Sequence, residues 1–284
     1  MSTQRGEHSE DELWVCRLGT VPYLDAVTIQ ERIRERRQAG ELPDTVLLLE
    51  HPPVYTRGRR SAEDELPLGE DFYRTQGIEV VTTDRGGRIT YHGPGQLVGY
   101  PIMGIESIGR YLRMIEAAII SALAGEGIRA RSRCAEGPDY TGVWVEDRKI
   151  ASIGVHVSRG ITTHGFAINV ENDLDPFSWI VACGLPDVTM TSVARERASG
   201  RELDARRFQT RVIDEFCDAH GRHMRVVSPR RLGLKPVAPP QPARTRGRTP
   251  RASHLLGSQA CADATQESTI RDPASLVRGQ QAAP

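Results

Sequence analysis

The sequence has no net charge and no hydrophobic run of membrane-spanning length. Thirty-seven basic residues balance 37 acidic ones among 284 residues, so no overall field favours nucleic acid or an anionic membrane. The most apolar stretches, 45–49 and 117–124, are far shorter than the roughly 20 residues of a spanning helix. The acidic start, residues 1–12, lacks the basic and apolar regions of a secretory signal. We therefore expect a cytoplasmic protein that neither spans a membrane nor binds nucleic acid.

The five cysteines form no even, closely spaced framework. Without an export signal we expect them to be reduced thiols rather than disulfides. The sequence also lacks a clustered Cys/His ligand set and a GxxxxGKS/T phosphate-binding loop. It therefore predicts no bound metal, no nucleotide and no other cofactor.

Lysine is nearly absent, since Lys149 and Lys235 are the only lysines among the 37 basic residues. A coding preference for arginine accounts for this bias along the chain. A lysine retained inside the folded region still needs a reason, because arginine would serve equally well in water. Lysine differs in that burial lets it release a proton, which arginine cannot readily do. Lys149 is therefore a candidate for a site that needs a titratable amine or a compact cation beside a thiolate.

The two ends of the chain differ in composition from the middle. Residues 1–12 are predicted to be a disordered tail. Residues 233–284 contain seven prolines, no aromatic residue, and seven basic against three acidic residues. Such a segment cannot bury enough apolar surface to offset its chain entropy, so we expect a second disordered tail. Residues 13–232 then form one domain, which is long enough to bury a core.

Helical and strand patterns follow one another irregularly within this domain. Helices are predicted over 23–39, with Leu24, Val27 and Ile33 apolar, over 107–125, and over 205–220 between the cap Asp204 and Gly221. Strands are predicted over 13–17, 46–49, 78–82, 97–100, 128–131, 141–145, 149–157, 162–170 and 224–227. The absence of a regular strand–helix–strand repeat indicates a single α+β domain, with mixed sheets flanked by helices.

The densest functional signal is the segment RGGRITYHGPGQ, residues 85–96. Its glycines let the backbone approach a ligand closely, and such loops offer N–H groups to an anion. A tight hairpin between two strands would need similar glycines. Here Arg85, Thr90, Tyr91 and His92 add donors, a ring and a titratable group, which favours a binding site over a plain hairpin.

Two other segments carry candidate reactive groups. Alternation along the strand predicted at 149–157 would place Lys149, Ala151 and Ile153 on one face, although a solvated edge lysine is the ordinary alternative. Cys183 is followed by glycine and a Leu-Pro pair, at a turn that can present a thiol. By itself this is weak evidence, because a lone reduced cysteine is more often a small buried hydrophobe.

Taken together, these segments resemble the lipoyl(octanoyl) transferases. The motifs occur in the family's order, and Cys183 follows Lys149 by the 34 residues that the family pattern requires. The resemblance covers about residues 13–227. The matching positions are 50–56 with Gly58 and Arg59, 84–87 with 90–97, Tyr100 and Pro101, 149–151 with Gly154 and Val155, 164–167 with Asn169, and Cys183 with Gly184.

The resemblance implies a fold and a reaction. The fold is that of lipoate- and biotin-protein ligases, in which the acyl chain lies in a cleft beneath the glycine-rich loop. The reaction takes an octanoyl group from the thioester of acyl carrier protein. It gives this group to a lysine ε-amine on lipoyl domains of 2-oxoacid dehydrogenase complexes or on the glycine-cleavage H protein, without a cofactor.

The resemblance also implies roles for individual residues. Cys183 would carry the acyl group as a thioester, which is ordinary covalent catalysis. A neighbouring ammonium lowers the pKa of a thiol, so Lys149 would favour the thiolate and later accept the proton of the incoming amine. Substrate contacts are implied for Arg85, Gly86, Gly87, Arg88, Ile89, Thr90, Tyr91, His92, Ser152, Ile153, Gly154, Gly165, Phe166 and Ala167.

Two kinds of alternative remain. A lipoate–protein ligase or a lipoyl amidotransferase would share the fold, but a ligase forms an acyl-adenylate with ATP and needs no cysteine. A non-catalytic acyl-binding relative would be free to lose the lysine and the cysteine, and this chain has both.

Overall fold

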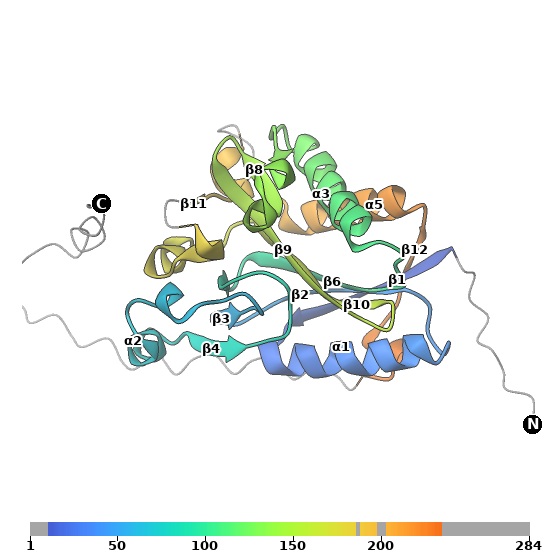
Figure 1. Ribbon diagram of the computed structural model, residues 1–284. Coiled ribbons are helices and arrows are strands. Elements are labelled where there is room, and N and C mark those ends of the chain that lie inside the picture. Colours follow the sequence, from blue (N-terminus) through green and yellow to red (C-terminus); the bar gives the residue numbers. More distant parts are fainter. Residues whose placement is uncertain (1–10, 186–187, 198–202, 235–284) are drawn as a thin grey trace, which may run out of the picture. The chain divides into compact units, whose positions relative to one another are not determined.

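The computed structural model describes residues 11–185, 188–197 and 203–234 (Figure 1). In this part of the chain the larger sheet has nine strands, with β11 (Thr189–Met190) paired to the beginning of β9. The other eight follow one another in the order β12 (His223–Val226), β1 (Glu12–Thr20), β2 (Thr45–Glu50), β6 (Gln96–Ile102), β10 (Ile161–Asn169), β9 (Arg148–Ser158), β8 (Gly142–Val145) and β7 (Arg131–Ser132).

The larger sheet is mixed. Strand β1 runs parallel to both β12 and β2, and β11 runs parallel to β9. The pairings from β2 through β6, β10, β9 and β8 to β7 are antiparallel. This mixture confirms the predicted α+β class and excludes a doubly wound parallel sheet.

The glycine-rich segment connects a smaller sheet to the larger one. Its strands have the order β4 (Glu79–Thr82), β3 (Val54–Arg57) and β5 (Thr90–His92). Strand β5 continues through a turn at 93–95 into β6 of the larger sheet. The glycine-rich segment is therefore a loop at 85–89, a short strand and a turn, rather than one hairpin. The short helix α2 (Glu70–Thr75) contacts β4.

Helices cover both faces of the larger sheet (Figure 1). Helix α1 (Tyr23–Gln38) packs on one face, with Ile33 in a core cluster that includes Leu47. Helices α3 (Ile108–Ala124) and α5 (Ala205–His220) pack on the other face, where Leu48 belongs to their core cluster. Neighbouring residues of β2 thus point to opposite faces and both are buried, which explains the continuous apolar run at 46–49. The remaining helix, α4 (Val193–Glu196), is a single turn.

The helix ends follow their predicted chemistry. The side chain of Asp204 accepts a hydrogen bond from the Arg207 N–H at 2.9 Å, and α5 ends at Gly221 in a left-handed conformation. Ser107 caps α3 in the same way. In the described residues no helix is both long and apolar enough to cross a membrane.

Two details of the predicted elements are wrong. Leu24 was expected on the apolar face of α1, but it is exposed, whereas Ile33 is buried as expected and Ala26 and Gln30 are buried as well. Tyr23 and Ala26 of the same first turn are buried, so Leu24 lies on the outward side of the helix. The strand expected at 128–131 is reduced to β7, which has two residues, because Ile128 is used to pack against the core beneath α3 and α5.

The folded region extends slightly beyond the predicted range of 13–232. Strand β1 begins at Glu12, and Leu234 is buried with Leu232 in the core cluster beneath α1. Because a side chain that packs in the core belongs to the domain, the C-terminal boundary of the domain lies at Leu234 rather than at the predicted residue 232. The rest of the predicted tails, 1–10 and 235–284, lies outside the described residues.

Candidate active site

A cavity of about 510 Å³ lies where the two sheets meet, a size typical of small-molecule sites. Its walls come from the glycine-rich loop, from β9 and β10, from the first turns of α3 and from the segment 138–141. The structure places nearly all the site residues expected from the sequence in these walls. The exceptions are Ile89 and Tyr91.

Ile89 and Tyr91 face away from the cavity. Strand alternation in β5 turns Thr90 and His92 toward the cavity and Tyr91 toward the opposite side. There the Tyr91 ring packs against Phe177, with centroids 5.5 Å apart. The Ile89 side chain is completely buried in the same cluster. Neither side chain lines the cavity, although the backbone of Ile89 has a different use described next.

Cys183 and Lys149 meet in the wall of the cavity. Lys149 Nζ donates a hydrogen bond to Cys183 Sγ at 3.1 Å. Strand β11, which follows the cysteine, pairs with the start of β9 so that Met190 lies opposite Lys149. This pairing brings together two residues that are 34 positions apart. Cys183 is half-buried, and Lys149 is only 2% exposed, which contradicts a solvated edge lysine.

The backbone at Cys183 presents the thiol on a strained turn. Its φ is +58°, a left-handed conformation that residues other than glycine rarely adopt. The Cys183 N–H donates to the Ile89 carbonyl at 3.1 Å, which fixes the turn to the glycine-rich loop. The following Gly184 has φ +68°, and a Cβ there would lie 2.2 Å from Arg88 Cδ. The glycine after the cysteine is therefore required by both conformation and space.

Lys149 faces the cavity because β9 carries a bulge. Trp144 of β8 pairs with Lys149, while the residue before Trp144 pairs with Ala151, so Ile150 is an extra residue on β9. An extra residue shifts which side chains share a face. Lys149 and Ser152 therefore both line the cavity, whereas Ala151 is packed in the core. The simple alternation that placed Lys149 beside Ala151 is wrong for this reason.

Arg85 supports the glycine-rich loop from inside the protein. Its Nε and one terminal nitrogen donate to Thr56 Oγ1 at 3.1 and 2.7 Å, and the other terminal nitrogen donates to the Gly86 carbonyl at 3.0 Å. Burial lowers the pKa of this guanidinium. The loop also rests on β9, where a Cβ on Gly154 would lie 2.6 Å from the Gly86 carbonyl oxygen. Gly154 thus allows the glycine-rich loop to approach the backbone of β9 closely. This close approach explains the glycine without any contact to a substrate.

Two buried histidines, one in the cavity wall and one behind it, are neutral rings. His92 Nδ1 donates to Gln96 Oε1 at 2.7 Å, and burial holds the pKa of His92 well below its usual value. His51 Nδ1 donates to the Val21 carbonyl and its Nε2 accepts from the Tyr100 hydroxyl, both at 2.7 Å. Burial lowers the pKa of His51 to about 4. Both rings are therefore uncharged at neutral pH. His92 lines the cavity, and His51 supports the lining residue Tyr100 from behind.

His164 also lines the cavity. His164 Nε2 donates to Asp84 Oδ1 at 2.9 Å, and this bond is the main reason that the pKa of Asp84 is lowered to about 2. Its backbone N–H is held by Gln30 of α1. The sequence placed His164 inside a motif but gave it no role, and it gave none to Tyr23, Ile108 or Leu112, which also line the cavity. The last three lie outside every recognised motif, and only the fold brings them here.

The arrangement suits a thiol nucleophile with a base beside it. Apolar side chains line part of the cavity, including Ile153, Phe166 and Leu112, and can accommodate a hydrocarbon chain. Cys183 and Lys149 line the same cavity. Within the described ranges, no group of three or more His, Cys, Asp or Glu side chains could hold a metal ion.

Comparison with known proteins agrees with this geometry. The model of the lipoyl protein ligase A/B catalytic domain matches residues 22–217, so the chain belongs to that family. Among its relatives, the octanoyltransferase of Rubrobacter xylanophilus is 45% identical over 207 residues, which cover 72% of this chain and 91% of the relative. That of Acidothermus cellulolyticus is 49% identical over 187 residues, which cover 63% and 79%.

Solved structures confirm the predicted lipoate-ligase fold. Lipoate-protein ligase A bound with ATP superposes with a TM-score of 0.62 and 18% identity, over 76% of this chain and 89% of that one. A putative lipoate protein ligase from T. acidophilum with bound lipoic acid gives a TM-score of 0.61 and 17% identity over the same shares of the two chains. At these identities the likeness concerns the fold alone.

Proposed function

We propose that this protein is an octanoyltransferase that carries the acyl group on Cys183. The observation that carries this proposal is the 3.1 Å contact between Lys149 Nζ and Cys183 Sγ in the wall of a partly apolar cavity. Membership of the lipoyl protein ligase A/B family and the octanoyltransferase relatives support it. The ligase alternative would make no use of the cysteine.

The proposed transfer has two steps. First, the Cys183 thiolate attacks the thioester carbonyl of the donor, the donor thiolate leaves, and the octanoyl group remains on Sγ. Second, an acceptor lysine amine attacks this new thioester, an amide forms, and Cys183 leaves as a thiolate. Lys149 stabilises the thiolate as an ammonium, and when uncharged it accepts the proton that the amine loses.

The reaction defines the partners. The donor is an octanoyl thioester of acyl carrier protein. The acceptors are lipoyl domains of 2-oxoacid dehydrogenase complexes or the glycine-cleavage H protein. The transfer would take place in the cytoplasm. The acyl chain would be held by the glycine-rich loop and the strands β9 and β10, where Ser152, Gly165 and Ala167 line the same cavity as Cys183 and Lys149.

The test is intact-mass spectrometry of the protein after incubation with octanoyl-acyl carrier protein. We expect one octanoyl adduct, located on Cys183, that disappears when a lipoyl domain is added. Cys183→Ala should form no adduct and transfer nothing, while its melting temperature stays close to that of the wild type, because the thiol is half-buried at the surface of the cavity.

Cys134 provides the matched control, because it is also a half-buried free thiol. Cys134→Ala should load and discharge normally. Full transfer by Cys183→Ala would disprove the covalent mechanism. A bound acyl-adenylate in place of the thioester would instead identify a ligase.

A further inference from the structure

Trp144 lies opposite Lys149 on the neighbouring strand β8. Its side chain is only 1% exposed and is not part of the cavity wall. No motif of the sequence includes it. The bulge in β9 is what places Lys149 across from this tryptophan, so the pairing is a property of the folded chain.

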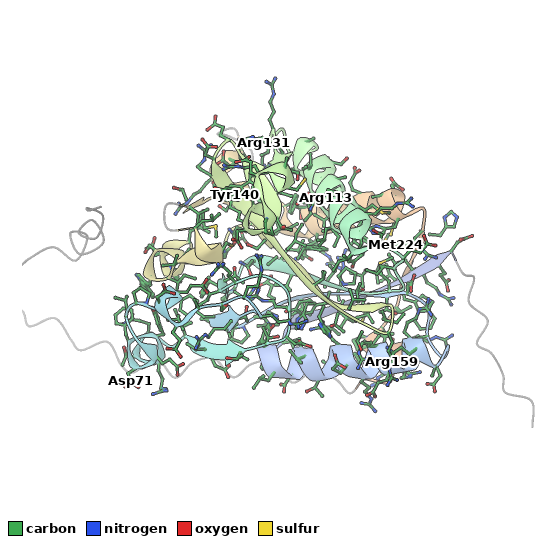
Figure 2. The ribbon with its side chains drawn as sticks, in the orientation of Figure 1. Asp71, Arg113, Arg131, Tyr140, Arg159 and Met224 are labelled. Carbon is green, nitrogen blue, oxygen red and sulfur yellow. The ribbon has the colours of Figure 1, made fainter. Side chains whose placement is uncertain are left out.

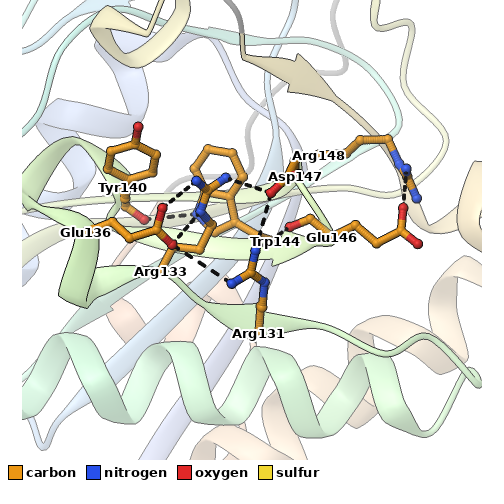
Figure 3. Close-up of polar contacts among 8 residues, drawn as sticks. All are labelled: Arg131, Arg133, Glu136, Tyr140, Trp144, Glu146, Asp147 and Arg148. Carbon is orange, nitrogen blue, oxygen red and sulfur yellow. Dashed lines mark hydrogen bonds and ion pairs between the residues drawn. The ribbon is translucent and has the colours of Figure 1, made fainter.

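The Trp144 indole is held firmly in place (Figure 3). Its Nε1 donates to the Tyr140 carbonyl at 2.9 Å. The Arg133 guanidinium lies over the indole, 4.7 Å from the ring centroid, and also over the Tyr140 ring. Arg133 is paired with the carboxylates of Glu136 and Asp147. Its charge is therefore compensated, and its plane serves to fix the orientation of the indole.

The segment that carries this stack is anchored to α3. Glu116 of α3 is buried, and its carboxylate accepts hydrogen bonds from Ser132 Oγ at 2.6 Å and from the Gly142 N–H at 3.0 Å. Strands β7 and β8 contact α3, and in Figure 2 Arg131, Tyr140 and Arg113 all lie on the side of the larger sheet opposite α1. The stack thus rests on a helix of the core.

Lys149 has few partners for its charge. Its Nζ lies 5.2 Å from the Trp144 ring centroid, within the distance of a cation–π contact. In the described part of the chain, no carboxylate lies within ion-pair distance of this nitrogen, and its hydrogen-bond partner is Cys183 Sγ. A buried charge needs compensation. Once the thiol is acylated it no longer carries a negative charge, and the indole is then the remaining partner.

We propose that Trp144 is a positioning residue that holds Lys149 beside Cys183, above all in the acyl-enzyme. This rests on the proposed function, because the acyl-enzyme is part of it. During discharge Lys149 becomes an ammonium as it takes the proton of the attacking amine, and with Cys183 acylated the indole is the remaining partner that stabilises this charge. Removal of Trp144 should therefore slow the discharge of the acyl group more than its loading.

The test compares Trp144→Leu, Trp144→Phe and Trp14→Leu in single-turnover experiments. Trp14 is the matched control, because it is also a buried tryptophan of the same sheet with arginines 5.3 and 5.8 Å from its ring, and it does not line the cavity. The amplitude of loading reports the fraction of folded enzyme. The rate constants of loading and discharge report the placement of Lys149 and do not depend on the fraction of folded enzyme.

We expect Trp144→Leu to slow discharge about tenfold, the scale of a lost cation–π contact to a desolvated ammonium, and to slow loading less. Trp144→Phe keeps an aromatic face and should restore most of the discharge rate. Trp14→Leu should lower the amplitude and the melting temperature but leave both rate constants unchanged. An unchanged discharge rate in Trp144→Leu, or an equal loss in Trp14→Leu, would overturn the proposal.

Alkylation of Cys183 by iodoacetamide gives a second measurement that needs no acyl donor. Lys149 beside the thiol favours its reactive form, so Trp144→Leu should react more slowly at Cys183 than the wild type, and Trp144→Phe and Trp14→Leu should not. Cys134 in the same samples reports nonspecific changes. If the wild type fails to load octanoyl, the proposed function fails, while the alkylation rates still decide the role of Trp144.

Discussion

Lys149 occupies a space that is shaped for its own side chain. It is 2% exposed, and a Cβ on Gly142 would already lie 2.8 Å from Lys149 Cε. The two ends of the side chain are fixed as well, by the strand pairing with Trp144 and by the hydrogen bond to Cys183. A residue so enclosed tolerates little change in length or width.

Lys149→Arg should therefore be far more damaging than a change that conserves charge usually is. The planar guanidinium needs more room, and it cannot readily give up or take up a proton. We expect this variant to load octanoyl slowly and to discharge it more slowly still. Separate single-turnover measurements of the two steps decide this. Near-normal rates for both would show that Lys149 has no part in the chemistry.

Histidine burial predicts a pH dependence of stability. Burial lowers the pKa of His51 from 6.5 to about 4, so the unfolded chain binds a proton in this window and the folded chain does not. The free energy of unfolding is therefore highest, with respect to His51, above pH 6.5, and it decreases as the pH falls toward 4. The full loss attributable to His51, for a shift from 6.5 to about 4, is about 3 kcal/mol.

Urea denaturation at pH 7.5 and at about pH 4.5 measures this loss. His51→Gln is expected to be less stable at the higher pH, but to lose less on acidification than the wild type does. The exposed His223 supplies the control, and His223→Gln should keep the wild-type loss. An unchanged loss in His51→Gln would mean that other groups cause the acid sensitivity.

At the scale of elements, α5 shows how a local signal sets the limits of a helix. Asp204 accepts the Arg207 N–H at its start, and Gly221 takes up the left-handed conformation at its end. Its buried side, including Phe208, Val212 and Phe216, packs against α3. The caps fix the ends, while the packing supplies most of the stability.

Asp204→Ala should lower the free energy of unfolding by about 1 kcal/mol, because the freed N–H loses its acceptor. Asp204→Asn, which can still accept, should lose less. Chemical denaturation measures both. The transfer rate should stay unchanged in each variant, since Asp204 does not line the cavity. A loss of transfer with no loss of stability would contradict the capping role.

At the scale of the whole molecule, the end of the domain follows from burial. Leu232 is completely buried and Leu234 is 6% exposed, and both pack in the core cluster beneath α1. Arg36 of α1 also donates to the Leu232 carbonyl at 2.9 Å. The chain is thus part of the core up to Leu234, although the composition of the following residues predicts a tail.

Deletion of residues 235–284 should leave the melting temperature and the transfer rate essentially unchanged, because their composition cannot supply a core. Deletion from Leu232 onward should destabilise the protein by several kcal/mol, on the order of the cost of removing a buried leucine side chain. Thermal unfolding of the two truncated proteins distinguishes the cases. A large loss of transfer from the shorter deletion would assign those residues a function.

The strands and helices were predicted from local patterns of residues. The predictions were confirmed where the pattern was strong. The run at 46–49 became β2 because both of its faces are covered, and the capped segment 205–220 became α5 as predicted. Local patterns failed for Leu24 and for the strand at 128–131, because the position of each relative to the sheet decides its burial.

The sequence by itself determined the α+β class, the glycine-rich loop and the candidate pair Lys149 and Cys183, since these depend on residue types, order and spacing. Only the tertiary structure decided how the pair meets. The pairing of β11 with β9 closes the 34-residue separation, and the bulge at Ile150 turns Lys149 toward the thiol. The bulge also brings Trp144 opposite the lysine, and alternation in β5 turns Tyr91 away from the cavity. Strand register and bulges arise from long-range pairing, which a local pattern of residues does not contain.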